Sequence, residues 1–479
     1  MRSASFLLLL VAGCSLAPRY QRPPAPVAAE FPTRSSADPE RSGPRGREVE
    51  GRTPAADLGW RDVFGDPRLQ ALVALALENN RDLRMTALNV ELTQAQYRIQ
   101  RADLLPALGA SASASRARVP ADLNTSGRAV TADQFSIGLG VTAFELDFFG
   151  RVRSLSTAAL EQYLATEEAR RSAQLSLVAA VAEQYFTARA LDDQVALAEQ
   201  TLKTVDASLA LARRTFEAGR TSELDLRTAE AQVETARVNL SLAREQRGQA
   251  GNALSLLVGA PLPSDLPAPQ PLDAQPIVAD LPTGVPSDVL IRRPDVLAAE
   301  HALRAANASI GAARAAFFPS ISLTAFGGTS SAELSGLFGS GSAIWSFSPR
   351  VNLPIFTGGA LRASLDVAQI RKSVEVARYE RTIQGAFREV ADALVAKGAV
   401  DDQLRANQAR VTAEERRYHL SEVRYRGGVD SYLSVLTAQR DLFAAQQALI
   451  QTRLSRLANL VELYKALGGG WTEKSASPL

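Results

Sequence analysis

RVRSLSTAALEQYLATEEARRSAQLSLVAA, at residues 151–180, opens a stretch that reaches Val258 without a proline, in a chain that contains 24 prolines. Apolar residues recur along this stretch at intervals of three and four, which is the period of an α-helix. At about 1.5 Å per residue, a helix from Arg151 to Phe216 would be roughly 100 Å long. An ordinary globular domain cannot bury a helix of that length, so the stretch predicts an elongated helical element.

The helical period breaks at Ala218-Gly219-Arg220-Thr221. After the break, Ser222 is of the residue type that caps a helix N-terminus. Glu223 and Asp225 then place negative charge in the first turn, where the helix dipole favours it. The chain therefore turns back at Gly219, and residues 151–258 are predicted to form a very long antiparallel helical hairpin with a polar tip.

The same pattern occurs twice in the chain. Phe216-Glu217-Ala218-Gly219 aligns with Tyr425-Arg426-Gly427-Gly428, which lies 209 residues later, and Pro106 aligns with Pro319, which lies 213 residues later. A period this long is not that of a short solenoid repeat. The body of the chain is therefore a tandem duplication of a large unit, which indicates pseudo-symmetric assembly around an axis.

The first residues have the features of a secretion signal. Arg2 gives a basic start, and the apolar run that follows is too short to span a membrane as a mature helix. The run ends in Leu10-Val11-Ala12-Gly13-Cys14, which resembles the lipobox of bacterial lipoproteins and implies cleavage before Cys14 and lipid on its thiol. The alternative is an incidental cysteine at the end of an uncleaved anchor. Because Cys14 is the only cysteine, an intrachain disulfide is impossible.

Composition and repeat divide the chain into segments. A signal peptide at 1–13 precedes a lipid-anchored, proline-rich tether at 14–56. The first repeat, 57–261, holds a helix, a β-hairpin at 106–147 and the helical hairpin at 151–258. A linker at 262–286 leads to the second repeat, 287–470, which holds a helix, a β-hairpin at 319–354 and a helical hairpin at 360–467, and a tail follows at 471–479.

Each repeat contains two stretches in which the period changes from helical to two. Their apolar positions alternate with serine, threonine, glycine and a few larger polar residues; the apolar positions are Leu108, Ala110, Ala112, Ala114, then Phe135, Ile137, Leu139, Val141, then Ile321, Leu323, Ala325, and finally Trp345, Phe347, Val351. One apolar and one small polar face suit membrane β-strands that separate lipid from a lumen. The alternative is four strands of a soluble sandwich.

Four strands cannot close a membrane barrel, because exposed strand edges do not persist in hydrocarbon and the smallest usual barrel has about eight strands. The strands of a barrel must therefore come from several chains. No stretch of roughly 20 apolar residues follows the signal. The composition, 46% hydrophobic and 22% charged with a net charge of +2, argues against a nucleic-acid binder.

Nothing in the sequence indicates an enzyme. The two histidines, His301 and His419, lie far apart on helical stretches, where a lone histidine is usually a packing or surface residue. Gly468-Gly469-Gly470 lacks the lysine and the helix of a phosphate loop. We expect no catalytic residue, no metal and no cofactor other than the covalent lipid on Cys14.

Several motifs in combination resemble one family. They are the lipobox, the duplicated unit, GVPSDVLIRRPDV at 284–296, YRGGVDSYLSVLTAQR at 425–440 and LVELYKALGGGW at 460–471. Together they resemble the outer-membrane factors, the TolC-like channels of tripartite efflux pumps, in the lipoprotein branch that serves resistance-nodulation-division transporters. The resemblance implies an α+β membrane protein: a homotrimer whose three chains form a 12-stranded β-barrel, continued by a long α-helical periplasmic tunnel.

The function that this resemblance implies is an outer-membrane exit channel of a drug or solute efflux pump. It would be a passive conduit, gated at its periplasmic tip and opened when a periplasmic adaptor docks. Its partners would be that adaptor, an inner-membrane resistance-nodulation-division transporter and the lipid bilayer, without nucleic acid. A channel for protein secretion would share the architecture. A non-conducting periplasmic coiled-coil lipoprotein is the second alternative, which the serine and glycine alternation disfavours.

The two helical turns are the expected docking sites for the adaptor. Gly219 and Gly428 permit left-handed backbone conformations that a side chain would oppose. The expected docking residues are Gly219, Arg220 and Thr221 in the first tip and Gly428, Val429 and Asp430 in the second. The alternative is that the glycines only permit the turns.

The resemblance also places a gate on the helix after the second tip. Leu433, Thr437, Arg440 and Asp441 fall on one face of this helix. In the family, residues here project into the tunnel; Leu433 and Arg440 match its pattern, whereas Thr437 stands where an acidic residue is common and Asp441 supplies a carboxylate one turn later. Tyr425 and Asp225 resemble the family's latch, which ties one hairpin to the next. The alternative is an ordinary coiled-coil surface.

Overall fold

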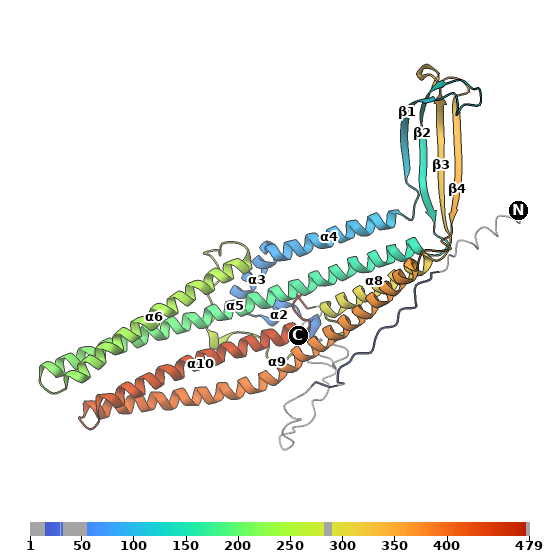
Figure 1. Cartoon of the computed structure of the whole chain (residues 1–479). Helices are drawn as coiled ribbons and strands as arrows, with labels where there is room; N and C mark the ends of the chain where they lie inside the picture. Colours follow the sequence, from blue (N-terminus) through green and yellow to red (C-terminus); the bar gives the residue numbers. More distant parts are fainter. Residues whose placement is uncertain (1–14, 29, 32–54, 282–289, 476–479) are drawn as a thin grey trace. The chain divides into compact units, whose positions relative to one another are not determined.

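The proline-free stretch forms one continuous helix, α5 (Arg151–Glu217), and α6 (Glu223–Val258) follows it as the second arm of a hairpin. Their counterparts in the second copy are α9 (Ala360–Arg426) and α10 (Tyr432–Ala466). Because α5 and α9 both contain 67 residues, the duplication has kept the length of the long arm unchanged. Figure 1 shows the two hairpins with their turns.

The structure, a computed structural model, describes residues 15–28, 30–31, 55–281 and 290–475. Cys14, the signal peptide, most of the expected tether, the end of the linker at 282–286 and the start of the second repeat at 287–289 lie outside the described residues. No helix in the described ranges is long and apolar enough to cross a membrane.

The helical turns have the same backbone in both copies. Gly219 has a φ of +69° and Gly428 a φ of +70°, in the region that favours glycine. The next amide of each turn reaches back to the last turn of the long helix: Arg220 to the carbonyl of Thr215, and Val429 to that of Arg424. This is the hydrogen bonding of a helix end with a left-handed residue beyond it.

Ser222 caps α6, as expected. Its hydroxyl accepts from the amide of Asp225 at 3.2 Å, and the Asp225 carboxylate accepts from the amide of Ser222, which completes a capping box. In the second copy, Ser431 makes no such side-chain bond; the Asp430 carboxylate accepts from the hydroxyl of Ser434 instead. The two tips therefore share a backbone but differ in their polar contacts.

Short helices precede each β-hairpin. In the first copy these are α2 (Trp60–Val63), α3 (Pro67–Asn79) and α4 (Arg81–Ala102), and in the second copy α8 (Pro294–Ala315). The helical pattern breaks at Asn80, whose side chain accepts from the amide of Leu83 and donates to the carbonyl of Leu257. Single 3₁₀ turns lie at Ala55–Asp57, Leu272–Ala274 and Leu334–Gly336.

Four antiparallel strands form one sheet in the order of the chain: β1 (Leu108–Val119), β2 (Val130–Leu146), β3 (Ser320–Ser331) and β4 (Ala343–Asn352). The central pair, β2 with β3, joins the two copies. β1 and β4 are the free edges of the sheet (Figure 1).

A β-bulge between Val141 and Phe144 keeps the apolar side chains of β2 on one face. Before the bulge, the odd-numbered residues share a face, and Val141 pairs with Ala325; after it Phe144 pairs with Leu323 and Leu146 with Ile321. The bulge lies at Ala143, which has a φ of +51° and whose amide donates to the Thr324 hydroxyl. An extra residue in one strand of a pair shifts the alternation by one.

The two sequence repeats are not the compact units of the fold. One compact unit contains residues 89–167 and 298–380 with the N-terminal segment, and the other contains 25–88, 168–297 and 381–479. Each unit therefore takes segments from both repeats, and the boundaries fall inside α4, α5, α8 and α9. The reason is that β2 pairs with β3 across the repeat boundary, so that neither copy completes its sheet alone.

The second unit has the main apolar core. Trp60, Phe64 and Tyr464 are fully buried in it, and the rings of Phe64 and Tyr464 meet edge to face at 5.8 Å. The Tyr464 hydroxyl donates to the carbonyl of Leu58. The expected tail also contributes, because the amide of Trp60 donates to the carbonyl of Thr472 and so fixes the tail to α2.

Candidate functional site

The sheet has one apolar and one polar face, as the alternation predicts. Its register pairs the apolar positions with one another, for example Leu108 with Val141 and Ala325 with Phe347. The opposite face pairs Ser113 with Ser136, whose hydroxyls lie 2.7 Å apart, and Thr324 with Ser348. This pattern can separate hydrocarbon on one side from water on the other.

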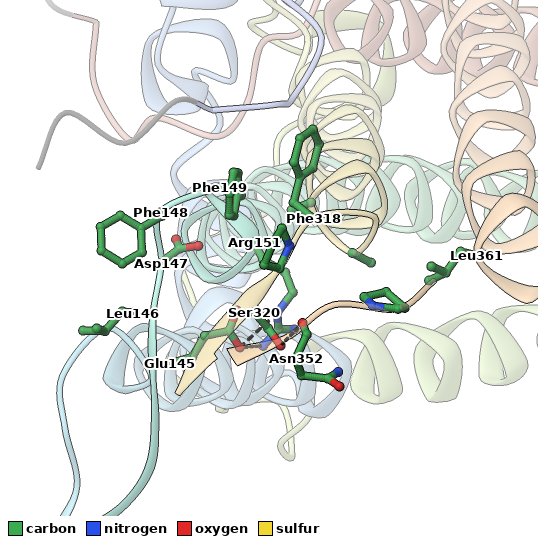
Figure 2. Close-up of a pocket in the computed structure, with 14 residues that line it drawn as sticks. Glu145, Leu146, Asp147, Phe148, Phe149, Arg151, Phe318, Ser320, Asn352 and Leu361 are labelled. Atoms are coloured by element: carbon green, nitrogen blue, oxygen red, sulfur yellow. Dashed lines mark hydrogen bonds and ion pairs between the residues drawn. The ribbon is translucent and has the colours of Figure 1, made fainter. Parts of the chain in front are cut away.

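At the helix end of the sheet, ion pairs fix the transition from strand to helix. Arg151 at the start of α5 donates to both carboxylate oxygens of Glu145, at 2.8 and 2.5 Å, and the Asp147 carboxylate accepts from the amide of Arg153. The Phe149 ring stacks on Phe318, with centroids 4.8 Å apart. These groups surround a pocket of about 420 Å³, where Figure 2 shows Glu145 near Ser320 at the strand ends.

The expected gate residues Leu433, Thr437 and Arg440 lie on an accessible face of α10. Leu433 is 67% exposed, and the Arg440 side chain is 73% exposed. The Thr437 hydroxyl donates to the carbonyl of Leu433 within α10, and the side chain is half-buried. Nothing else in the described chain covers Leu433 or Arg440, which leaves both available to a lumen.

Asp441 belongs to a different contact. Its carboxylate accepts from Arg417 of α9 at 2.9 Å and lies 3.4 Å from the guanidinium of its neighbour Arg440. The hydrogen bond from Arg417 is the main reason that the pKa of Asp441 lies below its usual range. Asp441 therefore ties α10 to α9, and it adds less to a charged collar with Arg440 than the sequence suggested.

The expected latch residues lie near each other without a hydrogen bond between them in the described chain. The Tyr425 ring packs against Tyr432, with centroids 5.3 Å apart. The Asp225 carboxylate accepts from the amide and hydroxyl of Ser222. Burial, and after it the charge of Asp225, raises the pKa of Tyr425. The capping box thus occupies Asp225 within its own tip.

A small apolar cluster that the sequence did not suggest links the two helical hairpins near their tips. Tyr432 and Val435 of α10 pack there with Ala212 of α5 and Ala229 of α6, and Tyr418 and Tyr425 border them. The seven-residue spacing of Tyr418 and Tyr425 on α9 was the available signal, since seven residues return to one helix face, whereas Tyr432 lies beyond the turn on α10.

The tips expose different groups. In the first tip Arg220 is exposed, and the Thr221 hydroxyl donates to that of Thr215 at 3.2 Å. In the second, Val429 is 67% exposed and Asp430 is paired with Arg424 at 3.1 Å. A Cβ atom on Gly219 or Gly428 would meet nothing within 4 Å, so only backbone strain opposes a side chain there.

Residues 15–22 are not a free linker, which corrects the expectation for this part of the tether. They form an N-terminal strap along α8: Arg314 donates to the carbonyl of Leu16, and Asn307 to that of Pro18. Tyr20 and Arg22 then both bind Glu300. The six residue steps from Leu16 to Arg22 span about 20 Å when extended, which matches the ~21 Å of the fourteen helical steps from Glu300 to Arg314.

His301 serves as a packing residue. Its Nδ1 lies 2.6 Å from a carboxylate oxygen of Glu161, which joins α8 to α5. In the part of the chain that the structure describes, no group of three or more histidine, cysteine or acidic side chains could hold a metal ion.

A model of the outer membrane efflux protein family matches residues 72–260 and 285–469, one range on each copy of the duplicated unit. The chain belongs to this family. The toluene efflux pump outer membrane protein TtgC of Pseudomonas putida is 51% identical over 473 residues, which cover 99% of this chain and 96% of that protein. The outer membrane protein OprJ of Pseudomonas aeruginosa is 46% identical, over 98% of this chain and 96% of that protein.

The solved structures include the open state of the MtrE outer membrane channel of Neisseria gonorrhoeae. It superposes with a TM-score of 0.86 at 42% identity, covering 97% of this chain and all of MtrE. The α+β fold class is therefore confirmed, with four strands and two long helical hairpins per chain. This family member is an outer-membrane efflux channel, located in the outer membrane and extending into the periplasm; the secretion channel and the scaffold are not favoured.

Proposed function

We propose that the chain acts as a homotrimer, the passive and gated exit conduit of a tripartite efflux pump. The observation that carries this proposal is the sheet with two free edges, one apolar face and one polar face. Unpaired backbone groups of β1 and β4 cannot remain in hydrocarbon. Three chains with four strands each pair all edges in a barrel of twelve strands, within the range of membrane barrels.

Exposed apolar stripes on two helices support contacts between chains. Met85, Leu88 and Leu92 follow one face of α4, and Val367, Ile370 and Val374 follow one face of α9. Apolar residues three and four positions apart form a continuous stripe on a helix. A stripe that none of the described residues of its own chain covers is suited to packing against a second copy.

The polar face suits a water-filled conduit without chemistry of its own. Serine, glycine and threonine dominate this face of the strands, and such small side chains leave the lumen open. The family and the relatives are channel proteins, and we assign no enzymatic activity to the chain.

The gate would be formed by α10 near the second tip. Threefold repetition of Leu433 gives an apolar constriction, and Thr437 and Arg440 repeat as rings one and two turns further. Asp441 contributes one contact between α10 and α9 through its ion pair with Arg417. If this face of α10 were an ordinary coiled-coil surface, the exposure of the apolar Leu433 side chain would have no functional reason.

The two tips would receive a periplasmic adaptor that connects the channel to an inner-membrane resistance-nodulation-division transporter. Three chains offer six tips with the same backbone, and exposed Arg220 and Val429 give them one charged and one apolar contact. TtgC is named as part of a toluene efflux pump, which fits export of small apolar compounds.

Lipid on Cys14 would complete the membrane attachment. The N-terminal strap runs antiparallel to α8, which brings residue 15 to the end of α8 that leads into β3. A thioether-linked lipid one residue earlier would then enter the membrane beside the foot of the sheet.

Conductance across a planar bilayer tests the proposal. The purified protein should migrate as a trimer and give small, infrequent currents, because the gate rests closed. Variants that weaken the gate should give large, steady currents through the same trimer. Trimers that never conduct, even with Leu433, Thr437 and Arg440 all replaced by serine, would overturn the conduit.

A further inference from the structure

Two arginines lie on the apolar face of the sheet. Arg116 and Arg118 of β1 are even-numbered, like Leu108 and Ala114, and the β1–β2 register runs without interruption from Leu108 to Val119. Both side chains therefore point to the side that faces lipid. Pairing of the free β1 edge with another chain uses backbone groups in the plane of the sheet, and it leaves this face uncovered.

Their height along the strand places them at the outer boundary of the membrane. The helices leave the sheet at the Leu108 end of β1, so the opposite end, with the loop at 120–129, is extracellular. The ten residue steps from Leu108 to Arg118 extend about 34 Å, and a strand tilt of roughly 40° reduces this to a height of about 26 Å. The apolar band of such barrels is about 25 Å tall.

The charge at this position is only partly compensated. Arg116 lies 3.4 Å from Asp133, its cross-strand neighbour, yet its side chain remains 75% exposed. Arg118 pairs in the register with the neutral Thr131, and no ion pair of Arg118 occurs among the described residues. Asp133 therefore compensates Arg116 only, and the charge of Arg118 has no ion-pair partner among the described residues.

We propose that Arg116 and Arg118 bind a phosphate of the phosphorylated glycolipid in the outer leaflet of the outer membrane. Residues two apart on one face of a strand are about 7 Å from each other, so both guanidinium groups can converge on one phosphate. Arginine suits this ligand, because its planar fork binds phosphate oxygens in pairs. The inference rests on the outer-membrane location of the family and not on the export function.

The experiment measures how many lipids stay bound to the purified full-length trimer in native mass spectrometry. The probes are diphosphoryl lipid A, the same lipid A with its phosphates removed, and phosphatidylglycerol as an anionic phospholipid. The test variant is Arg116→Gln with Arg118→Gln. The matched control is Arg350→Gln, which removes an arginine from the polar face of β4.

Wild type and Arg350→Gln should retain diphosphoryl lipid A, and the double variant should bind it about tenfold or more weakly, since charge-assisted contacts are lost. The phosphate-free lipid and phosphatidylglycerol should bind weakly to all three proteins. Equal retention of lipid A by the double variant would overturn the site. Equal retention of phosphatidylglycerol or of phosphate-free lipid A by wild type would overturn the choice of ligand.

Arg118→Gln alone keeps the test decisive if the double variant does not assemble, because it leaves the Arg116–Asp133 pair intact. This single variant should still lose lipid A, and unchanged retention contradicts the proposal. Bilayer conductance of each variant should equal that of wild type, so a failure of the lipid site and a failure of the conduit are separate results.

Discussion

Arg22 donates to both carboxylate oxygens of Glu300, at 3.1 and 2.7 Å, although 278 residues separate the two in the chain. Tyr20 and Arg304 also donate to Glu300, and the Glu300 side chain is only 4% exposed. The Arg304 guanidinium lies over the Tyr20 ring, 5.1 Å from its centroid. Glu300 is therefore the residue that fastens the N-terminal strap to α8.

Glu300→Gln should release the strap and lower stability by about 1–3 kcal/mol, because charged hydrogen bonds are lost from a buried group. Thermal melting of the detergent-solubilised protein measures this loss. Glu415→Gln, an exposed glutamate of α9, is the control and should melt like wild type. Equal melting of Glu300→Gln and wild type at neutral pH would show that the strap is not fastened there.

The same pair predicts a pH dependence. Burial raises the pKa of Glu300, but the hydrogen bond from Arg22 and the charges of Arg304 and Arg22 outweigh it, so the pKa lies below 4.5. A lowered pKa contributes stability that is present above the unfolded value and lost as the pH falls through the folded value. The melting difference between wild type and Glu300→Gln should therefore be full at pH 7 and shrink below pH ~4.5.

Cys14→Ser should abolish lipoprotein processing and the incorporation of labelled palmitate, because serine offers no thiol. The trimer should still form, since the barrel holds itself in the membrane. Labelling of cells followed by immunoprecipitation and a native gel measures both effects. Label on the serine variant would exclude Cys14 as the lipid site.

Bulky residues at the tips should reduce export without disturbing the turns. Arg220→Trp and Val429→Trp leave the left-handed glycines in place, so the helical hairpins should keep their stability. We expect lower drug resistance and weaker crosslinking to the adaptor. Gln408→Trp, on a middle part of α9, is a control outside the tips. Unchanged export and crosslinking in both tip variants would mean that the glycines only permit the turns.

Tyr425→Phe combined with Arg440→Ser should raise conductance and admit large antibiotics such as vancomycin. The first change removes the hydroxyl that a latch to Asp225 would use, and the second removes an exposed charge from the gate face of α10. Bilayer currents and vancomycin sensitivity are the measurements. Arg410→Ser, an exposed arginine of α9, should behave like wild type. A double variant that assembles and remains impermeable places the gate elsewhere.

Ala143→Val should destabilise the sheet by about 1–3 kcal/mol, because a β-branched side chain opposes a positive φ. Ala143→Gly should be neutral or stabilising, since glycine adopts this conformation freely. Melting of the purified trimer measures both, with Ala112→Val on the apolar face of β1 as the control. Equal stability of the valine and glycine variants would mean that the bulge relaxes at no cost.

Local patterns predicted the elements of this fold well. The absence of proline and the period of three and four indicated α5, and the alternation at Leu108 and Ile321 indicated strands and their faces. The bulge was visible only as a change from odd to even apolar positions after Val141, which is easily taken for the end of a strand. Turn chemistry at Gly219 and Ser222 depends on neighbouring residues alone, so the sequence sufficed there.

Local sequence patterns could not predict the contacts between distant segments of the chain. From the sequence alone, Glu300 looks like a solvated helical residue; in the structure, Arg22 of the strap binds it. Asp441 looks like a charge of the gate; in the structure, it accepts a hydrogen bond from Arg417 of α9. Both assignments depend on which helix faces are turned toward each other. Tertiary packing decides that, and a single sequence gives no measure of it.

Because strands of the two repeats pair with each other, the sheet cannot be completed until most of the chain has been exported. The β1–β2 hairpin ends at Leu146, whereas β3, its partner in the sheet, begins only at Ser320, and β4 ends at Asn352. Throughout that interval the hairpin exposes an apolar face and an open edge to the aqueous periplasm. We expect nascent chains to aggregate during this time unless a holding chaperone covers the apolar face of the hairpin. We expect a chain truncated after the first repeat to aggregate or to be degraded, because β2 then has no β3 with which to pair.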